Sequence, residues 1–136
     1  MNIKERITDS EILWKNQRFE GAFLMILCAV AAIAEVRYPA LKDREKFEKF
    51  LRESTQIKLG IEYKGQLTSI ETIFYKFMRC KLVHEGGLPQ DIKLVIEHGE
   101  NARHIRAGGA PDYVLHIGYG WFEFLKQAVT KAPEYT

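Results

Sequence analysis

The feature that most constrains this fold is an apolar stretch from Ala22 to Ala34, which is bounded by Glu20 and Glu35. It is too short to span a bilayer, because a spanning helix needs about 20 apolar residues. A helix that is apolar on every side must be covered all round, either by other helices or by a second subunit. The stretch therefore predicts a core helix, and it is the first indication of a homodimer.

Residues on either side place the ends of this helix. Thr8 and Glu11 have the spacing of a capping box, in which both side chains satisfy amides of the first turn. Pro39 forces the preceding residue out of the helical conformation. The pattern predicts one helix over residues 10–36, with a length of about 40 Å.

Composition excludes several classes of protein. The chain has 136 residues, 46% of them hydrophobic, which is enough for one domain with a core and unlike a disordered chain. Its net charge of +2 excludes nucleic-acid binding through overall charge. The start lacks the apolar segment of a signal peptide. Cys28 and Cys80 lie in apolar helical patterns, which indicates reduced thiols, with a disulfide as the alternative. We expect a cytoplasmic protein without a membrane segment.

A second and a third helix are predicted after the first. The second covers residues 43–54 and carries an apolar stripe, and residues 55–66 have no sustained period and are predicted to be a loop. The third begins at Thr68, which has capping-box spacing to Glu71, and ends at Gly86. Its apolar face consists of Ile70, Ile73, Phe74, Phe77, Met78 and Leu82.

The period changes in the last third of the chain. Residues 92–96, 103–106 and 113–117 are short β-branched segments between turns, which predicts a hairpin or three-stranded meander at about 91–118. A final amphipathic helix is predicted over residues 119–132. The whole chain, 1–136, is thus expected to be one mainly α domain, in which four helices enclose a small β insertion before the last helix.

One pair of residues could carry chemistry. Arg79 and His84 lie near the end of the third predicted helix. Five positions along an ideal helix rotate by about 140°, so the two side chains do not lie one above the other. Arg79 offers a planar fork of donors that suits a phosphate, and His84 lies in the last turn, where a proton donor is favoured. The alternative is structural, because both residue types complement the carbonyl end of any helix.

This segment resembles the R-x4-6-H motif of the HEPN superfamily, and the order of the predicted elements is similar to that family over most of the chain. The resemblance implies an up-and-down four-helix bundle and a homodimer formed through the first and third helices. It also implies a metal-independent endoribonuclease that needs no cofactor and cleaves single-stranded RNA by 2′-hydroxyl attack, with Arg79 and His84 from both subunits. By resemblance, a toxin or antiviral-defence role and a regulatory partner protein are expected. The alternative is a non-catalytic HEPN module that binds RNA, a nucleotide or a partner protein.

Four further residues are candidates for supporting roles. Glu35 could hold the guanidinium of Arg79, or it could simply reach solvent. Lys81 and Glu85 flank the motif and could line the cleft expected between the third helices of two subunits, where they could contact RNA. Cys80 departs from the polar residue that often follows the arginine in active members of the family, and it is a poor partner for orienting an imidazole.

Other candidate sites are weaker. Cys28, Cys80 and His84 lack the spacing of zinc ligands, so no metal site is expected. Three histidines of the β insertion could gather on one face as part of a basic patch suited to stacking and phosphate contact. That patch would consist of His98, His104, His116, Arg103, Arg106, Tyr113 and Tyr119. The alternative is that these are ordinary surface residues of a hairpin.

Overall fold

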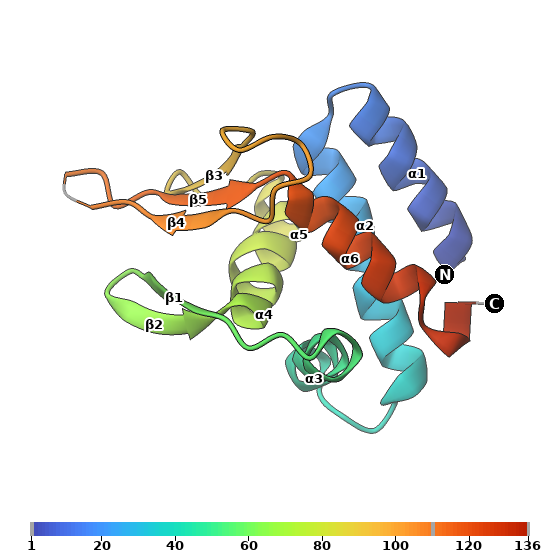
Figure 1. Ribbon diagram of the computed structural model, residues 1–136. Coiled ribbons are helices and arrows are strands. Elements are labelled where there is room, and N and C mark those ends of the chain that lie inside the picture. Colours follow the sequence, from blue (N-terminus) through green and yellow to red (C-terminus); the bar gives the residue numbers. More distant parts are fainter. Residues whose placement is uncertain (1, 110, 136) are drawn as a thin grey trace.

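The computed structural model describes residues 2–109 and 111–135. The prediction of a single helix over residues 10–36 is wrong. The segment belongs to two helices, α1 (Ile3–Lys15) and α2 (Phe19–Arg37). The N-cap of α1 is Asn2, so the capping box is not used. The chain reverses at Gln17, whose φ is 60°. α1 then folds back beside α2 (Figure 1), which covers one side of the apolar helix.

α2 is the central helix, as the apolar stretch predicted. It contacts α1, α3, α6 and the helical stretch that follows the β1–β2 hairpin. α2 is long and apolar enough to cross a membrane, with a mean hydropathy of 2.0. The core helix of a soluble protein can have the same length and hydropathy, so these two properties do not distinguish the two cases. One side of α2 stays partly exposed, along Met25, Cys28, Ala32 and Val36.

α3 (Asp43–Thr55) confirms the second predicted helix, and its stripe of Phe47, Phe50 and Leu51 is buried. The segment after it, predicted to be a loop, instead forms an antiparallel hairpin of β1 (Gly60–Tyr63) and β2 (Gln66–Ser69). Its two-residue turn places Lys64 and Gly65 at φ values of 53° and 78°. Positive φ at both positions is typical of a type I′ turn.

The third predicted helix is confirmed in extent but not in geometry. A short turn, α4 (Ile70–Thr72), leads into a π-helix (Ile73–Arg79) and then into α5 (Cys80–Glu85). Gly86 ends it with a φ of 78°, as its position predicted. The helix begins with Ser69, whose hydroxyl accepts a bond from the Thr72 amide, so the predicted capping box is wrong.

The β insertion contains the predicted hairpin, formed by its last two strands, but it is not a three-stranded meander. β3 (Ile92–Val95), β4 (Ile105–Ala107) and β5 (Leu115–Gly118) form a sheet in the order β3-β5-β4. β5 pairs in parallel with β3 and antiparallel with β4, because the 96–104 segment carries the chain across the sheet before β4 begins. One face of the sheet is buried through Ile92, Leu115 and Ile117.

α6 (Gly120–Thr130) confirms the last predicted helix and packs against α2, and a 3₁₀ turn (Pro133–Tyr135) follows. The expected four-helix up-and-down bundle is nevertheless wrong. The protein is a mixed α and β fold, in which a layer of helices carries two small sheets on one side (Figure 1). The split of the first helix and the additional hairpin account for the difference.

Candidate functional site

The predicted catalytic residues lie on the outer side of the helical stretch that runs from Ile70 to Glu85. The core side of this stretch is formed by Ile70, Ile73, Phe74, Met78 and Leu82. Arg79 and Cys80 are partly exposed, and Val83 and His84 are exposed. The two members of the Arg–His pair are therefore available to a partner. Because residues 80–85 are regular α-helix, the separation of five positions keeps the two side chains apart in angle.

Arg79 is held in place by two residues. Its Nη1 donates to the Asp43 carboxylate at 3.2 Å, and its guanidinium lies 5.5 Å from the centroid of the Tyr75 ring. The Tyr75 hydroxyl donates to the same carboxylate at 3.0 Å. Burial and this hydrogen bond raise the pKa of Tyr75 to about 12, so the phenol stays protonated as a donor. The π-helix ends at this arginine, and such helices occur frequently at functional sites.

A second cation lies near Arg79 and was missed by sequence reasoning. Burial raises the pKa of the Cys28 thiol on α2, while the charges of Arg79 and Arg6 act on it in the opposite direction. Arg6 of α1 is paired with Asp9 at 2.8 Å. The Nε atoms of both arginines are buried and have no hydrogen-bond partner among the described residues. Only the fold-back of α1 brings Arg6 here, so no local signal could have shown it.

His84 has no hydrogen bond, ion pair or ring contact with any described residue. In particular, Cys80 does not orient it, although the two are four residues apart. Its position in the last turn of α5 is as predicted. The imidazole is thus free to meet a substrate or a second subunit.

The remaining supporting candidates, Glu35, Lys81 and Glu85, all take part in ion pairs. Glu35 reaches solvent, as the alternative predicted, with a side chain that is 59% exposed and paired with Lys46 of α3, and Asp43 is the partner of Arg79 instead. Lys81 and Glu85 pair with each other at 3.3 Å along the helix. They form a solvated i,i+4 pair, which adds little to stability.

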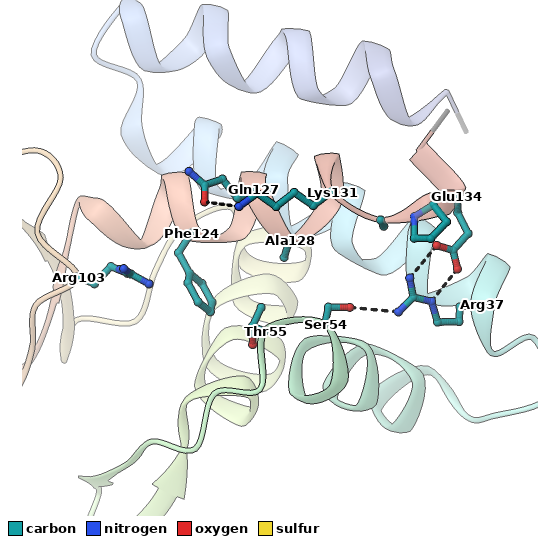
Figure 2. A pocket seen from close by; sticks show the side chains of 11 residues that line it. Arg37, Ser54, Thr55, Arg103, Phe124, Gln127, Ala128, Lys131 and Glu134 are labelled. Carbon is teal, nitrogen blue, oxygen red and sulfur yellow. Dashed lines mark hydrogen bonds and ion pairs between the residues drawn. The ribbon is translucent and has the colours of Figure 1, made fainter.

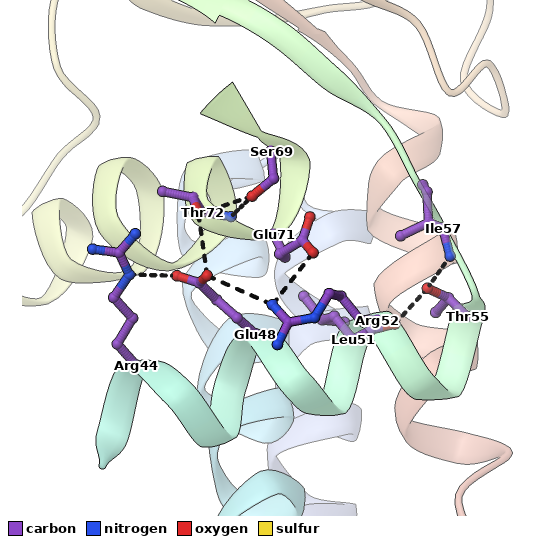
Figure 3. Close-up of polar contacts among 9 residues, drawn as sticks. All are labelled: Arg44, Glu48, Leu51, Arg52, Thr55, Ile57, Ser69, Glu71 and Thr72. Atoms are coloured by element: carbon purple, nitrogen blue, oxygen red, sulfur yellow. Dashed lines mark hydrogen bonds and ion pairs between the residues drawn. The ribbon is translucent and has the colours of Figure 1, made fainter. Parts of the chain in front are cut away.

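A buried polar network joins α3 to the start of the helical stretch that carries Arg79 (Figure 3). The Glu48 carboxylate accepts from Arg44 at 2.6 Å and from Thr72 at 3.2 Å. Arg52 lies between two carboxylates, 3.9 Å from Glu48 and 3.6 Å from Glu71, and the Glu71 side chain is only 5% exposed. Because the two carboxylates are buried and paired with arginines that reach the surface, the network fixes the position of this helix against α3.

A cleft of about 630 Å³ lies elsewhere, between the end of α3 and α6. Figure 2 shows Arg37, Arg103 and Lys131 around it, together with the ring of Phe124. Arg37 is neutralised by Glu134, which accepts two bonds from it at 2.6 and 2.7 Å. The guanidinium of Arg103 lies 5.6 Å from the Phe124 centroid. Neither Arg79 nor His84 lines this cleft.

Part of the predicted patch on the β insertion exists. The rings of His98 and His104 lie 4.0 Å apart, and Arg106 pairs in register with His116 on the neighbouring strand. Burial, followed by the charge of His98, lowers the pKa of His104. Since alternate residues of a strand share a face, His104 lies on the same face as Arg106.

Other residues expected in this patch lie elsewhere. Arg103 lines the α3–α6 cleft, and Tyr119 packs on Phe19 at 4.5 Å. Tyr113 is exposed in the loop before β5. Glu97, which the sequence did not single out, joins His98 and His104.

Comparison with known proteins defines the family. The family model described as Rv1289 matches residues 2–131, so the chain belongs to the Rv1289 family. No curated protein and no solved structure matches the chain.

Proposed function

We propose that the protein is a homodimeric, metal-independent endoribonuclease whose active centre combines Arg79 and His84 from two subunits. The observation that carries this proposal is the placement of both side chains on the outer side of one helix. Arg79 is held by Asp43 and Tyr75, while His84 has no partner among the described residues. A fixed cation and a free imidazole on one helix are two of the groups that phosphodiester cleavage requires.

A second copy of the chain would complete the set of groups. Cleavage of RNA without a metal ion needs a base for the 2′-hydroxyl, an acid for the leaving oxygen and positive charge on the phosphate. One His84 takes the 2′-hydroxyl proton as the 2′-oxygen attacks phosphorus. The bond from phosphorus to the 5′-oxygen then breaks, and the other His84 protonates that oxygen. The products are a 2′,3′-cyclic phosphate and a free 5′-hydroxyl.

The partly exposed side of α2 supports the dimer. Met25, Cys28 and Ala32 follow one another at helical spacing and are only partly covered. This apolar stripe is near Arg79, whose charge acts on the Cys28 thiol. Val83, which is 49% exposed, adds an apolar side chain next to His84. Burial of this surface between two copies would bring the two Arg–His pairs toward each other.

The test is cleavage of single-stranded RNA in EDTA by the purified chain, with the oligomeric state measured by light scattering. We expect cyclic-phosphate products from the native protein and at least a hundredfold slower cleavage by His84→Ala and Arg79→Ala. Lys76→Ala, which removes an exposed cation of the same helix, is the matched control and should cleave normally. Equal rates for the native chain and His84→Ala, or a strictly monomeric protein, would overturn the proposal.

A second candidate function is favoured by the α3–α6 cleft. A nucleotide could stack on Phe124 and place its phosphates against Arg103 and Lys131, while Arg37 is already neutralised by Glu134. Titration with a fluorescent nucleotide tests this candidate. Binding that is lost in Phe124→Ala and Arg103→Ala, with no RNA cleavage by the native chain, would establish a nucleotide-binding protein in place of the nuclease.

A further inference from the structure

We propose that Glu97, His98 and His104 form a binding site for a divalent transition metal of the zinc type, on the outer face of the β3-β5-β4 sheet. Each residue offers one ligand atom, and these atoms all lie within 4.8 Å of one another. The site is separate from Arg79 and His84, and it does not depend on the proposed ribonuclease activity.

The donor set selects the class of metal. Two imidazole nitrogens and one carboxylate oxygen suit Zn²⁺ and its neighbours in the transition series, whereas Ca²⁺ and Mg²⁺ require oxygen ligands. Three protein ligands also leave the fourth tetrahedral position open for water or another group. This is the ligand count of catalytic zinc sites.

The distances require only a small closure around the ion. Zinc bonds of about 2.0–2.1 Å place tetrahedral ligands roughly 3.4 Å apart, so no separation between ligand atoms must shorten by more than about 1.4 Å. Glu97 and His98 lie in the turn after β3 and are exposed, so their side chains can move without disturbing the core. The residue that directly precedes β4 supplies the fixed ligand.

His104 is that fixed ligand. Its carbonyl accepts a bond from the Gly118 amide at 2.6 Å and another from the Trp121 indole at 3.0 Å. The Nε2 atom of its ring is buried and has no hydrogen-bond partner in the described part of the chain. A buried ring nitrogen left in this way costs free energy, and coordination of a metal would remove that cost.

His98 lies close to His104, but no hydrogen bond joins their rings among the described residues. The ring of His98 lies 4.0 Å from that of His104. Two charged imidazolium rings at this distance would repel each other, whereas two neutral imidazoles can both coordinate one cation. The Glu97 carboxylate supplies the negative charge.

Two further side chains act on the site. Arg106 contacts Glu97 at 3.7 Å and competes with the metal for this carboxylate. Both are about half exposed, so the pair is weak and can be displaced. His116 lies opposite Arg106 in the register, and its Nδ1 is also buried without a described partner.

The test is titration of the metal-free chain with Zn²⁺ by calorimetry and with Co²⁺ by visible absorption. We expect one ion per chain, visible bands typical of tetrahedral Co²⁺, and an increase in Tm with added Zn²⁺. His98→Ala and Glu97→Gln change exposed side chains and should fold normally, but each should weaken binding at least tenfold. Glu100→Gln, an exposed carboxylate three residues further along, is the matched control and should bind as the native chain does.

Failure of the native chain to bind one ion would overturn the site, as would equal binding by His98→Ala or Glu97→Gln. A stronger complex in Arg106→Ala would support the competition described above. Because RNA cleavage is measured in EDTA, either proposal can fail while the other holds.

Discussion

The Arg79 guanidinium and the Asp43 carboxylate form an ion pair at 3.2 Å that joins the helix carrying the Arg–His pair to the first turn of α3. The arginine side chain is 22% exposed and the aspartate 60% exposed. The anion is therefore the partner that solvent or an RNA phosphate can replace. In the free protein, Asp43 both orients Arg79 and reduces its positive charge.

Removal of this charge should strengthen RNA binding. In Asp43→Asn the amide oxygen can still accept from Tyr75, but Arg79 is no longer neutralised. We expect several-fold tighter binding of single-stranded RNA at low salt, and a slope of log K against log salt that is steeper by about 0.7. Fluorescence anisotropy at several salt concentrations measures both, with Glu53→Gln as the control. An unchanged slope would show that Arg79 does not contact phosphate.

Arg52→Ala should destabilise the fold. The Glu71 side chain is 5% exposed and pairs with Arg52, so the substitution leaves a buried carboxylate without its cation. We expect a loss of about 1–2 kcal/mol in the free energy of unfolding, reduced from the fully buried case because Arg52 itself is half exposed. Urea denaturation is the measurement. Lys49→Ala, which removes an exposed partner of Glu53 at 3.9 Å, should change stability by less than about 0.5 kcal/mol.

The Arg37–Glu134 pair should make stability depend on pH. Its hydrogen bonds lower the pKa of Glu134, so the folded state binds this proton more weakly than the unfolded state does. The stabilisation is therefore fully present above the ordinary glutamate pKa, and it is lost as the pH falls through the lowered value. Compared with native protein, Glu134→Gln should have a lower Tm at pH 7 and nearly the same Tm at the acid end. A Tm difference that stays constant from pH 7 to pH 3 would contradict this account.

Two glycines at the junction of β5 and α6 should not tolerate a side chain. A Cβ at Gly118 would lie 2.6 Å from the Ala102 carbonyl oxygen, and one at Gly120 would lie 2.3 Å from that of Asn101. Both contacts involve backbone, so the segment that leads to His104 would have to shift. We expect Gly120→Ala to lower the free energy of unfolding by about 1–3 kcal/mol. Gly109→Ala, which meets nothing within 4 Å, should be nearly neutral. Titration of Gly120→Ala and Gly109→Ala with Zn²⁺ tests whether this packing also supports the metal site.

Patterns that are local in the chain determined much of the fold. The apolar stripe of Phe47, Phe50 and Leu51 predicted α3, and the predicted end of this helix lies within one residue of the observed end. Such a helix can be predicted locally because the residues that repeat at helical spacing are also the buried ones. Gly86 ended the helix of the Arg–His pair as predicted, since only a residue that tolerates positive φ fits there. The exposure of His84 and the angle between it and Arg79 also follow from helical geometry.

Tertiary structure decided the features that depend on distant segments meeting. Residues 15–18 are all polar and interrupt the apolar pattern, but the packing of α1 on α2 decides that the chain reverses there and does not continue as one helix. The parallel pairing of β3 with β5 likewise has no local signal, because strand order depends on how the sheet covers the helices.

The same reason applies to the sites. Asp43 lies 36 residues from Arg79 along the chain, and the sequence pointed instead to Glu35, whose partner is Lys46. The sequence predicted that His98 and His104 could lie on one face of the β insertion. The turn between β3 and β4 decides that their rings lie 4.0 Å apart and that Glu97 joins them. Caps and apolar periods are short-range properties of a chain, whereas ion pairs and ligand sets are determined by which surfaces pack together.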